Sequence, residues 1–234
     1  MARRAQSQDL LTAATTRSVL RTSEAKPQLL VSGQTIVSPE TRLRFQVSHL
    51  LGRGGFGEVY LTRRLGQSST VPDVVCIKAS SRIDGWLREA YFGQLLDGHP
   101  RAIRVFDAFP LVLGNGQFLY CLVLEFAKHG DLSAFLHRDG ARWTEPSVRR
   151  EIAGVLDVLG KLHRGQLLHR DLTPVNVFVC DKRQLKLGDF GIVRQQSGRT
   201  LSMEPNRSRN EETSPSRTRL HLARMQREVL PNLE

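Results

Sequence analysis

The chain has 234 residues, of which 40% are hydrophobic and 24% charged, a composition typical of a globular protein with one large or two small domains. Apolar runs such as FLYCLV at 118–123 are far shorter than the roughly 18 residues of a membrane-spanning helix, so no membrane span is expected. The formal net charge of +11 is spread along the chain: 5 basic and 3 acidic residues in 1–40, 22 and 15 in 41–196, and 7 and 5 in 197–234. Because the charge is not gathered in a patch and aromatic residues are not interleaved with it, specific nucleic-acid binding is not expected.

The cysteines and the N-terminal region bear on the cellular compartment of the protein. No pair of cysteines has metal-ligand spacing, and all three lie in strand-like apolar stretches: Cys76, Cys121 and Cys180. We expect buried free thiols, which favour a reducing, cytoplasmic location. Residues 1–30 contain arginines among serines and threonines, a weak indication of a transit peptide, but they lack the apolar segment of a signal peptide and contain Asp9 and Glu24.

Three regions differ in composition. Residues 1–40 are rich in Ser, Thr, Gln and Arg and predict a disordered arm. Residues 41–196 contain every strong strand or helix pattern. From 197 to 234 the chain is a polar, basic tail that ends in a short possible helix, LHLARMQREVL.

The middle region predicts an α+β fold. Alternating or β-branched apolar residues predict five strands, in RLRFQVSHLL, EVYLTR, DVVCIKAS, AIRVFDAF and QFLYCLVLEF. A helix is predicted over DGWLREAYFGQLL with Asp84 as its N-cap, and a short one over GDLSAFLHR. A long helix at 145–163 has Thr144 as N-cap, Pro146 in its first turn, and apolar residues at helical spacing: Val148, Ile152, Val155, Leu156, Leu159 and Leu162. Strands followed by helices predict two lobes with a cleft between them.

A glycine-rich stretch lies between the first two of these strands. LGRGGFGEVYL at 51–61 contains Gly52, Gly54 and Gly57. The same spacing opens dinucleotide-binding folds, but there a helix follows the glycines, whereas here a strand follows. The stretch therefore predicts a hairpin whose backbone can approach phosphates.

Charged residues follow at fixed places along the chain. Lys78 ends the strand DVVCIKAS, where alternation predicts that it faces the cleft under the glycines, and Glu89 of the next helix is its expected counter-charge. LLHRDLTPVNVFV then contains Asp171 and Asn176, and LKLGDFG contains Asp189. Each motif alone is compatible with an ordinary turn.

In this order, the glycine loop, Lys78, H-R-D-x-x-x-x-N at 169–176 and D-F-G at 189–191 resemble the eukaryotic-type protein kinase family over about residues 43–193. The resemblance implies a protein-kinase-like fold, with a complete small lobe of a five-stranded antiparallel sheet and one helix at 41–127. It also implies part of a helical large lobe at 128–196, containing the hinge, the catalytic loop and D-F-G.

The same resemblance implies ATP and Mg²⁺ as ligands and assigns roles to single residues. Lys78 would hold the α and β phosphates and Glu89 would orient Lys78. Asp171 would accept or orient the proton of the substrate hydroxyl, and Asn176 and Asp189 would bind magnesium. The hinge VLEFAKHGDL would place Leu124 as gatekeeper, the backbone of Glu125 and Ala127 at the adenine, and Asp131 at the ribose. The remaining nucleotide contacts would be Leu51, Gly52, Gly54, Gly57, Val59, Cys76 and Phe178.

Several positions depart from the family pattern. Cys76 stands where the family usually has alanine, Thr173 where serine/threonine kinases have a lysine that assists the γ-phosphate, and Gly93 where a larger apolar residue packs against the Phe of D-F-G. After Gly191 no A-P-E segment is readable, so only the first part of the large lobe is expected. Arg170 would ordinarily pair with a phosphorylated residue, for which the candidates are Ser197, Thr200 and Ser202.

Three functions remain open from the sequence. The first is a Ser/Thr-directed protein kinase, C-terminally truncated so that turnover by this chain is in question. The second is an ATP-binding pseudokinase or scaffold protein, and the third is an interaction protein whose basic arms bind acidic partners. The protein substrate and the oligomeric state are not encoded in any readable motif.

Overall fold

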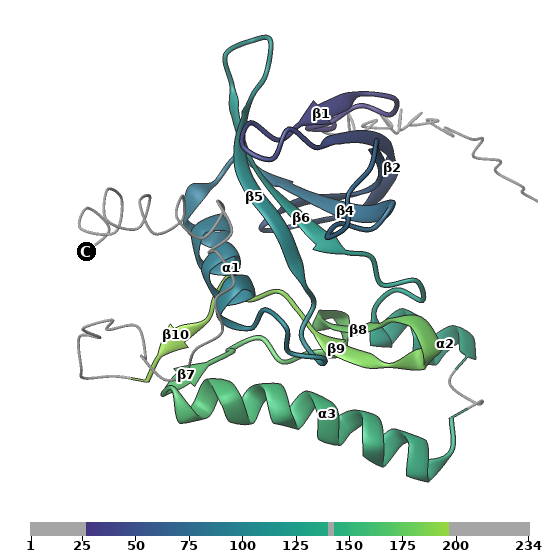
Figure 1. The fold of residues 1–234 in the computed structure, drawn as a ribbon. Helices are drawn as coiled ribbons and strands as arrows, with labels where there is room; N and C mark the ends of the chain where they lie inside the picture. Colours follow the sequence, from purple (N-terminus) through teal and green to yellow (C-terminus); the bar gives the residue numbers. More distant parts are fainter. Residues whose placement is uncertain (1–26, 140–142, 197–234) are drawn as a thin grey trace, which may run out of the picture.

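The computed structural model describes residues 27–139 and 143–196, and the predicted tail at 197–234 lies outside them. An antiparallel sheet and one helix form the small lobe, drawn at the top of Figure 1. Two helices and two short sheets form the helical lobe below it. The α+β class expected from the sequence is confirmed, because a predominantly antiparallel sheet precedes the longest helix in the chain order.

The small-lobe sheet has six strands in the order β1-β2-β3-β4-β6-β5, and all neighbours pair antiparallel. Strand β3 illustrates why the residues form a sheet, since Glu58, Tyr60, Thr62 and Arg64 alternate with less buried neighbours. The bounds of the strands are β1 Thr35–Val37, β2 Arg44–Gly54, β3 Gly57–Leu65, β4 Val74–Ser80, β5 Val105–Val112 and β6 Phe118–Glu125.

The first strand corrects two predictions from the sequence. The sheet was expected to have five strands and residues 1–40 to be a disordered arm, but β1 lies inside that range. Leu30 is 0% exposed and Ile36 is 1% exposed, and both join the core formed by Phe45 and Tyr60. The apolar residues of this stretch, at 29–31 and 36–37, give no sustained periodicity, so the burial of Leu30 and Ile36 depends on the sheet face that they cover.

The helix α1, Ile83–Leu95, packs beside the sheet, and the two other helices belong to the helical lobe: α2, Leu132–Asp139, and α3, Glu145–Arg164. Helix α1 begins two residues earlier than an N-cap at Asp84 predicts, with Arg82 at the N-cap and Asp84 in the first turn. Asp84 still lies where a negative charge favours the helix dipole.

The long helix α3 begins as the sequence predicts, with Thr144 at the N-cap and a proline in the first turn. Its buried apolar residues are Val155, Val158, Leu159 and Leu162. Ile152 and Leu156 belong to the predicted apolar stripe but are 40% and 57% exposed. The described residues therefore cover only part of that stripe.

Short elements complete the helical lobe and lie between α3 and the small lobe. Strand β7, Leu167–Leu168, pairs with β10, Arg194–Gln195, and β8, Val177–Val179, pairs with β9, Leu185–Leu187. Two 3₁₀ turns adjoin β8: Pro174–Asn176 and Asp181–Arg183. All three cysteines are buried and free, as predicted.

Within the described ranges, no helix combines the length and the apolar character that crossing a bilayer requires.

A buried ion pair connects the loop between α1 and β5 to the helical lobe. The guanidinium of Arg101 donates to Glu151 of α3 and, at 3.3 Å, to the carbonyl of Leu185. Glu151 also accepts the backbone N–H of Leu185 at 3.0 Å. Burial acts to raise the pKa of Glu151, but Arg101 and the other donors outweigh it, so the pKa lies below its ordinary value of 4.5.

Replacing Glu151 with glutamine should lower the free energy of unfolding by about 1–3 kcal/mol at neutral pH, because a buried charged acceptor is lost. Since the folded-state pKa is lowered, the contribution of Glu151 is present above pH 4.5 and disappears as the pH falls through the folded-state value. Urea unfolding at neutral pH and at about pH 3.5 should therefore show the difference between wild type and Glu151→Gln shrinking in acid. The control is Glu145→Gln, which breaks an exposed pair with Arg149; an equal cost for Glu151→Gln at both pH values would contradict the prediction.

Candidate nucleotide-binding site

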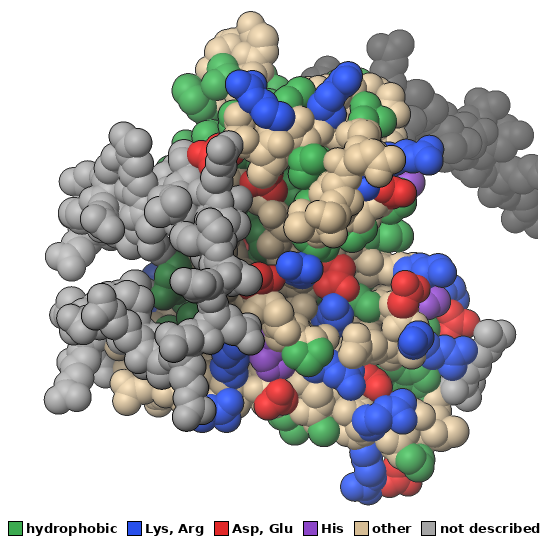
Figure 2. All heavy atoms as spheres, in the orientation of Figure 1, with side chains coloured by type: hydrophobic (Ala, Val, Ile, Leu, Met, Phe, Trp, Pro, Cys, Tyr) green, Lys and Arg blue, Asp and Glu red, His purple; other side chains and the backbone are tan. Residues whose placement is uncertain are grey.

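A cavity of about 380 Å³ lies between the small lobe and the β8–β9 sheet. In Figure 2, acidic and basic side chains lie next to one another across the middle of this face, between the two lobes. The cavity is lined by Gly52, Arg53, Gly54, Phe56, Gly57, Val59, Cys76, Lys78, Glu89, Ile103, Leu124, Glu125, Asp131, Val175, Asn176, Phe178 and Asp189. Segments far apart in the sequence therefore share one site.

The glycines form the tip of the β2–β3 hairpin, as predicted, with Gly54 paired to Gly57. Gly57 has a φ of 131°, and a Cβ there would lie 2.3 Å from the carbonyl oxygen of Ala79, so the fold itself requires glycine. A Cβ at Gly52 or Gly54 would meet nothing within 4 Å. Packing does not require these two glycines, and they border the cavity, where a ligand could approach the backbone closely.

Lys78 of β4 forms the charged centre of the site. Its Nζ lies 2.6 Å from Oε2 of Glu89 and 3.2 Å from Oδ1 of Asp189. Burial acts to lower the pKa of Lys78, but the two carboxylates outweigh it and the pKa is raised. Burial raises the pKa of Glu89, and Lys78 partly offsets this. The site thus holds a charged ammonium between carboxylates from α1 and from the segment after β9.

The segment 169–176 places a carboxylate and an amide together. Nδ2 of Asn176 donates to Oδ2 of Asp171 at 2.8 Å and to the carbonyl of Asp171 at 2.9 Å. The carbonyl oxygen of the Asn176 side chain is thereby left for another partner. Asp189 has a φ of 55°, a left-handed backbone conformation that is uncommon for a non-glycine residue.

His169, at the start of this segment, contacts the segment 188–190. Its Nε2 lies 3.0 Å from the carbonyl of Gly188, and its ring contacts that of Phe190 edge to face at 5.3 Å. Burial lowers the pKa of His169. The contacts fix the segment containing Asp171 against the segment containing Asp189.

The cavity also has apolar walls. Cys76 and Leu124 are cross-strand partners of β4 and β6, and Val59 and Phe178 approach from the hairpin and from β8. Burial raises the pKa of Cys76 to about 12, so its thiol acts as an apolar wall group. Ile103 and Val175 extend the walls, although no sequence pattern distinguished them.

Three of the predicted site residues do not line the cavity. Leu51 is 45% exposed, and Ala127 packs against Ile103 and Cys180. Asp171 reaches the site through its hydrogen bond to Asn176. The other predicted residues all line the cavity, together with Arg53 and Phe56, which lie among the glycines and received no role from the sequence.

Gly93 does not leave a hole in the core. A Cβ added to it would lie 2.1 Å from Cγ2 of Val105, so the Val105 side chain occupies the space that a larger residue would fill. The small size of Gly93 therefore leaves no empty space beside α1 at this position.

Replacing Gly93 with alanine should lower the free energy of unfolding by about 1–3 kcal/mol, because the added methyl group overpacks against Val105. Combining it with Val105→Ala should cost less than the two single substitutions together, since the smaller residue accommodates the methyl group. Denaturant unfolding of the three variants measures this coupling. Additive costs would show that the two side chains do not share the space.

Comparison with known proteins agrees with the geometry. The family described as "Protein kinase domain" matches residues 45–210. The Aurora/IPL1-related protein kinase 2 of Caenorhabditis elegans is 31% identical over 150 residues, which are 63% of this chain and 47% of that protein. The serine/threonine-protein kinase fused of Drosophila melanogaster is 34% identical over 157 residues, or 66% of this chain and 18% of that protein. The serine/threonine-protein kinase SBK1 of Mus musculus is 28% identical over 164 residues, or 69% of this chain and 38% of that protein.

The chain thus spans less than half the length of these relatives. The matched residues nevertheless include the glycine hairpin, Lys78, Asp171, Asn176 and Asp189. On the family match and the relatives together, the chain belongs to the protein kinase family.

Proposed function

We propose that this protein is an ATP-dependent protein kinase that transfers a phosphoryl group to a Ser or Thr hydroxyl. The observation that carries the proposal is the cluster of Lys78 with Glu89 and Asp189 beside the glycine hairpin, in one cavity. The Ser/Thr assignment is supported by relatives that are named serine/threonine kinases. In this proposal the described residues are the complete small lobe and the first part of the large lobe.

The proposed nucleotide contacts use both kinds of cavity wall. Val59, Cys76 and Phe178 enclose the adenine, with Leu124 at the back and the backbone of Glu125 and Ala127 beside the base. The open space beside Gly52 and Gly54 accepts the phosphates, and the ammonium group of Lys78 in the same cavity binds them. Asp131 already accepts the N–H of Ala134 at 2.8 Å through Oδ1, which leaves its other oxygen for the ribose.

The residues fit magnesium as well as ATP. Mg²⁺ prefers oxygen ligands and usually takes only one or two carboxylates from the protein. Asp189 supplies a carboxylate. Asn176 uses its side-chain NH₂ group for its hydrogen bonds to Asp171, so its side-chain carbonyl oxygen remains to bind the metal. Magnesium held by these residues would neutralise charge on the phosphate oxygens.

Asp171 is the proposed catalytic residue. Asn176 holds Oδ2 of Asp171, so Oδ1 remains to accept or orient the proton of the substrate hydroxyl. Thr173 stands two residues further on, and its buried Oγ1 has no hydrogen-bond partner among the described residues. This departure from the usual lysine favours the second candidate, a catalytically impaired ATP-binding protein.

Two measurements on the purified protein test the proposal. Binding of ATP by calorimetry, with magnesium and with a chelator, should show tighter binding with magnesium in wild type and a smaller difference in Asp189→Asn. Transfer of labelled phosphate to peptides that differ only in Ser, Thr or Tyr should favour Ser and Thr. ATP binding without transfer would support the impaired alternative, and the absence of ATP binding would contradict both.

A further inference from the structure

The buried carboxylate of Glu58 connects three parts of the small lobe. Glu58 directly follows Gly57 and is 5% exposed. Its Oε1 lies 3.0 Å from Nε of Arg53, which stands between Gly52 and Gly54. Its Oε2 accepts the backbone N–H of Leu29 at 2.8 Å and the hydroxyl of Tyr60. One side chain therefore joins both arms of the glycine hairpin to the segment that precedes β1.

That segment, residues 27–31, which we name the N-terminal strap, is itself anchored. Leu30 is 0% exposed, and its N–H donates to the Tyr60 hydroxyl at 3.0 Å. Burial, followed by the hydrogen bond to Glu58, raises the pKa of Tyr60 to about 12, so its hydroxyl remains a donor. Because Leu30 is buried and hydrogen-bonded to Tyr60, the N–H of the adjacent Leu29 is held in position to donate to Glu58.

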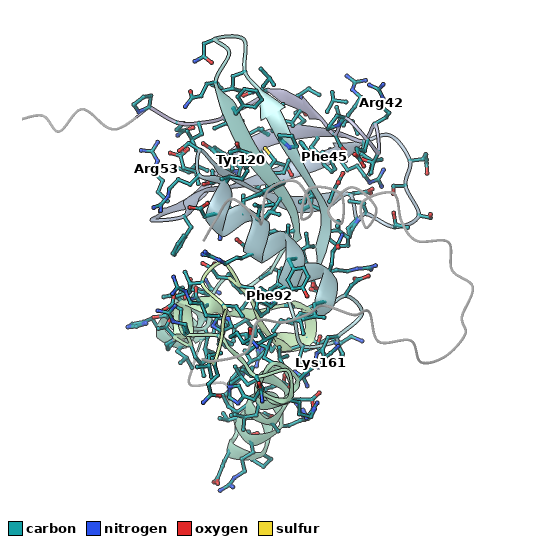
Figure 3. The ribbon with its side chains drawn as sticks, turned by 90° about the vertical axis from the view of Figure 1, so that its left-hand side faces the viewer. Arg42, Phe45, Arg53, Phe92, Tyr120 and Lys161 are labelled. Atoms are coloured by element: carbon teal, nitrogen blue, oxygen red, sulfur yellow. The ribbon has the colours of Figure 1, made fainter. Side chains whose placement is uncertain are left out.

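Besides these contacts, the hairpin tip is held by Phe56, whose ring centroid lies 5.9 Å from Nζ of Lys78. Residues 51–56 are exposed, and the pairing of β2 with β3 shifts register between Leu50 and Gly52. Arg53 is the cross-strand partner of Glu58, so both side chains project from the same face. Figure 3 labels Arg53 on the hairpin, at the edge of the small lobe. A buried carboxylate requires polar partners, and Glu58 finds them in Arg53 of the tip, in Tyr60 of β3 and in Leu29 of the N-terminal strap.

We infer that Glu58 is a positioning residue that holds the glycine hairpin over the cavity, and that the N-terminal strap fixes Glu58 through the N–H of Leu29. The inference rests on the proposed function, because it assigns the hairpin to the phosphates of ATP. It deepens that function by making a segment outside the cleft a determinant of phosphate binding.

A matched pair of variants isolates the hydrogen bond. Leu29→Pro removes the N–H that Glu58 accepts, whereas Leu29→Ala removes the side chain and keeps the N–H. Hydrogen exchange of peptides covering 50–60 should be faster by about tenfold in Leu29→Pro than in Leu29→Ala. Peptides from α3 should exchange equally in both variants, because α3 lies in the other lobe.

Affinity is the second readout. Leu29→Pro should weaken MgATP binding by about fivefold to tenfold, which is less than the loss of a direct charge-assisted hydrogen bond to a phosphate, because the lost bond acts only through the position of the hairpin. Adenosine, which lacks the phosphates, should lose less than about twofold. Glu58→Gln should change both readouts in the same direction, and it serves as the second variant if Leu29→Pro does not fold. Glu145→Gln, which removes an exposed carboxylate of α3, is the control that should change neither.

The outcomes separate this inference from the proposed function. Equal hairpin exchange in Leu29→Pro and Leu29→Ala, or in Glu58→Gln and Glu145→Gln, would overturn the inference. So would an equal loss of ATP and adenosine affinity. Faster hairpin exchange in a protein whose wild type binds no ATP would support the connection through Glu58 and reject ATP as the ligand.

Discussion

Replacing Asp171 with asparagine is expected to lower the rate of phosphotransfer by about 10²- to 10⁴-fold, while MgATP still binds. The substitution removes the proton acceptor but keeps a side chain of the same shape. It also keeps a group that can accept the hydrogen bond from Asn176, which is 2.8 Å long in the wild type. The rate at saturating ATP and the dissociation constant of MgATP measure the two effects separately.

The control for this variant is Asp181→Asn. Asp181 is 80% exposed and lies 3.7 Å from Lys128, away from the residues that line the cavity. The Asp181→Asn substitution removes one negative charge from the same lobe, as Asp171→Asn does, and should leave the rate of phosphotransfer unchanged. Full turnover by Asp171→Asn would remove Asp171 from the catalytic role, and a parallel loss of ATP binding would indicate a structural role.

Replacing Lys78 with methionine is expected to weaken MgATP binding by about tenfold to 150-fold, because a charge-assisted hydrogen bond to a phosphate is lost. The same change leaves Glu89 without its partner at 2.6 Å in a buried position. Breaking a buried pair by removing one member costs about 3–5 kcal/mol of stability. A thermal shift without nucleotide and a titration with MgATP measure the two losses.

A double variant separates stability from binding. Adding Glu89→Gln to Lys78→Met removes the unpaired carboxylate, so part of the lost stability should return. The phosphate-binding ammonium is still missing, so affinity for MgATP should stay low. Recovery of both properties would mean that Lys78 only supports the fold, and recovery of neither would mean that Glu89 is not the charge left uncompensated.

Local patterns in the sequence determined the composition of the site. The spacing of Gly52, Gly54 and Gly57 between two strand patterns predicted the hairpin, and alternation placed Lys78 toward the cleft. Glu89 was predicted as its partner because a lysine facing a cleft needs a counter-charge, and the structure places the two 2.6 Å apart. These features follow from residue type, period and order, which are properties of short segments.

Contacts between distant segments could not be read in the same way. Val105 fills the space beside Gly93, and Leu30 is buried against Tyr60, yet neither pair has a spacing that marks it. The expected five-stranded sheet and the upper bound of the expected arm, residue 40, were wrong for the same reason, since β1 pairs with β2 and adds a sixth strand. Residues 1–26 of that arm lie outside the described residues.

The sequence by itself therefore determined the family and most of the residues that surround the cavity, because these depend on local motifs in a fixed order. Only the tertiary structure decided what holds those residues in place. In the sequence, Glu58 is only one residue of a glycine-rich motif. In the folded protein, its carboxylate accepts the N–H of Leu29 at 2.8 Å. Burial and hydrogen bonding across about 30 residues of chain depend on how the segments pack, and that is not a property of any segment alone.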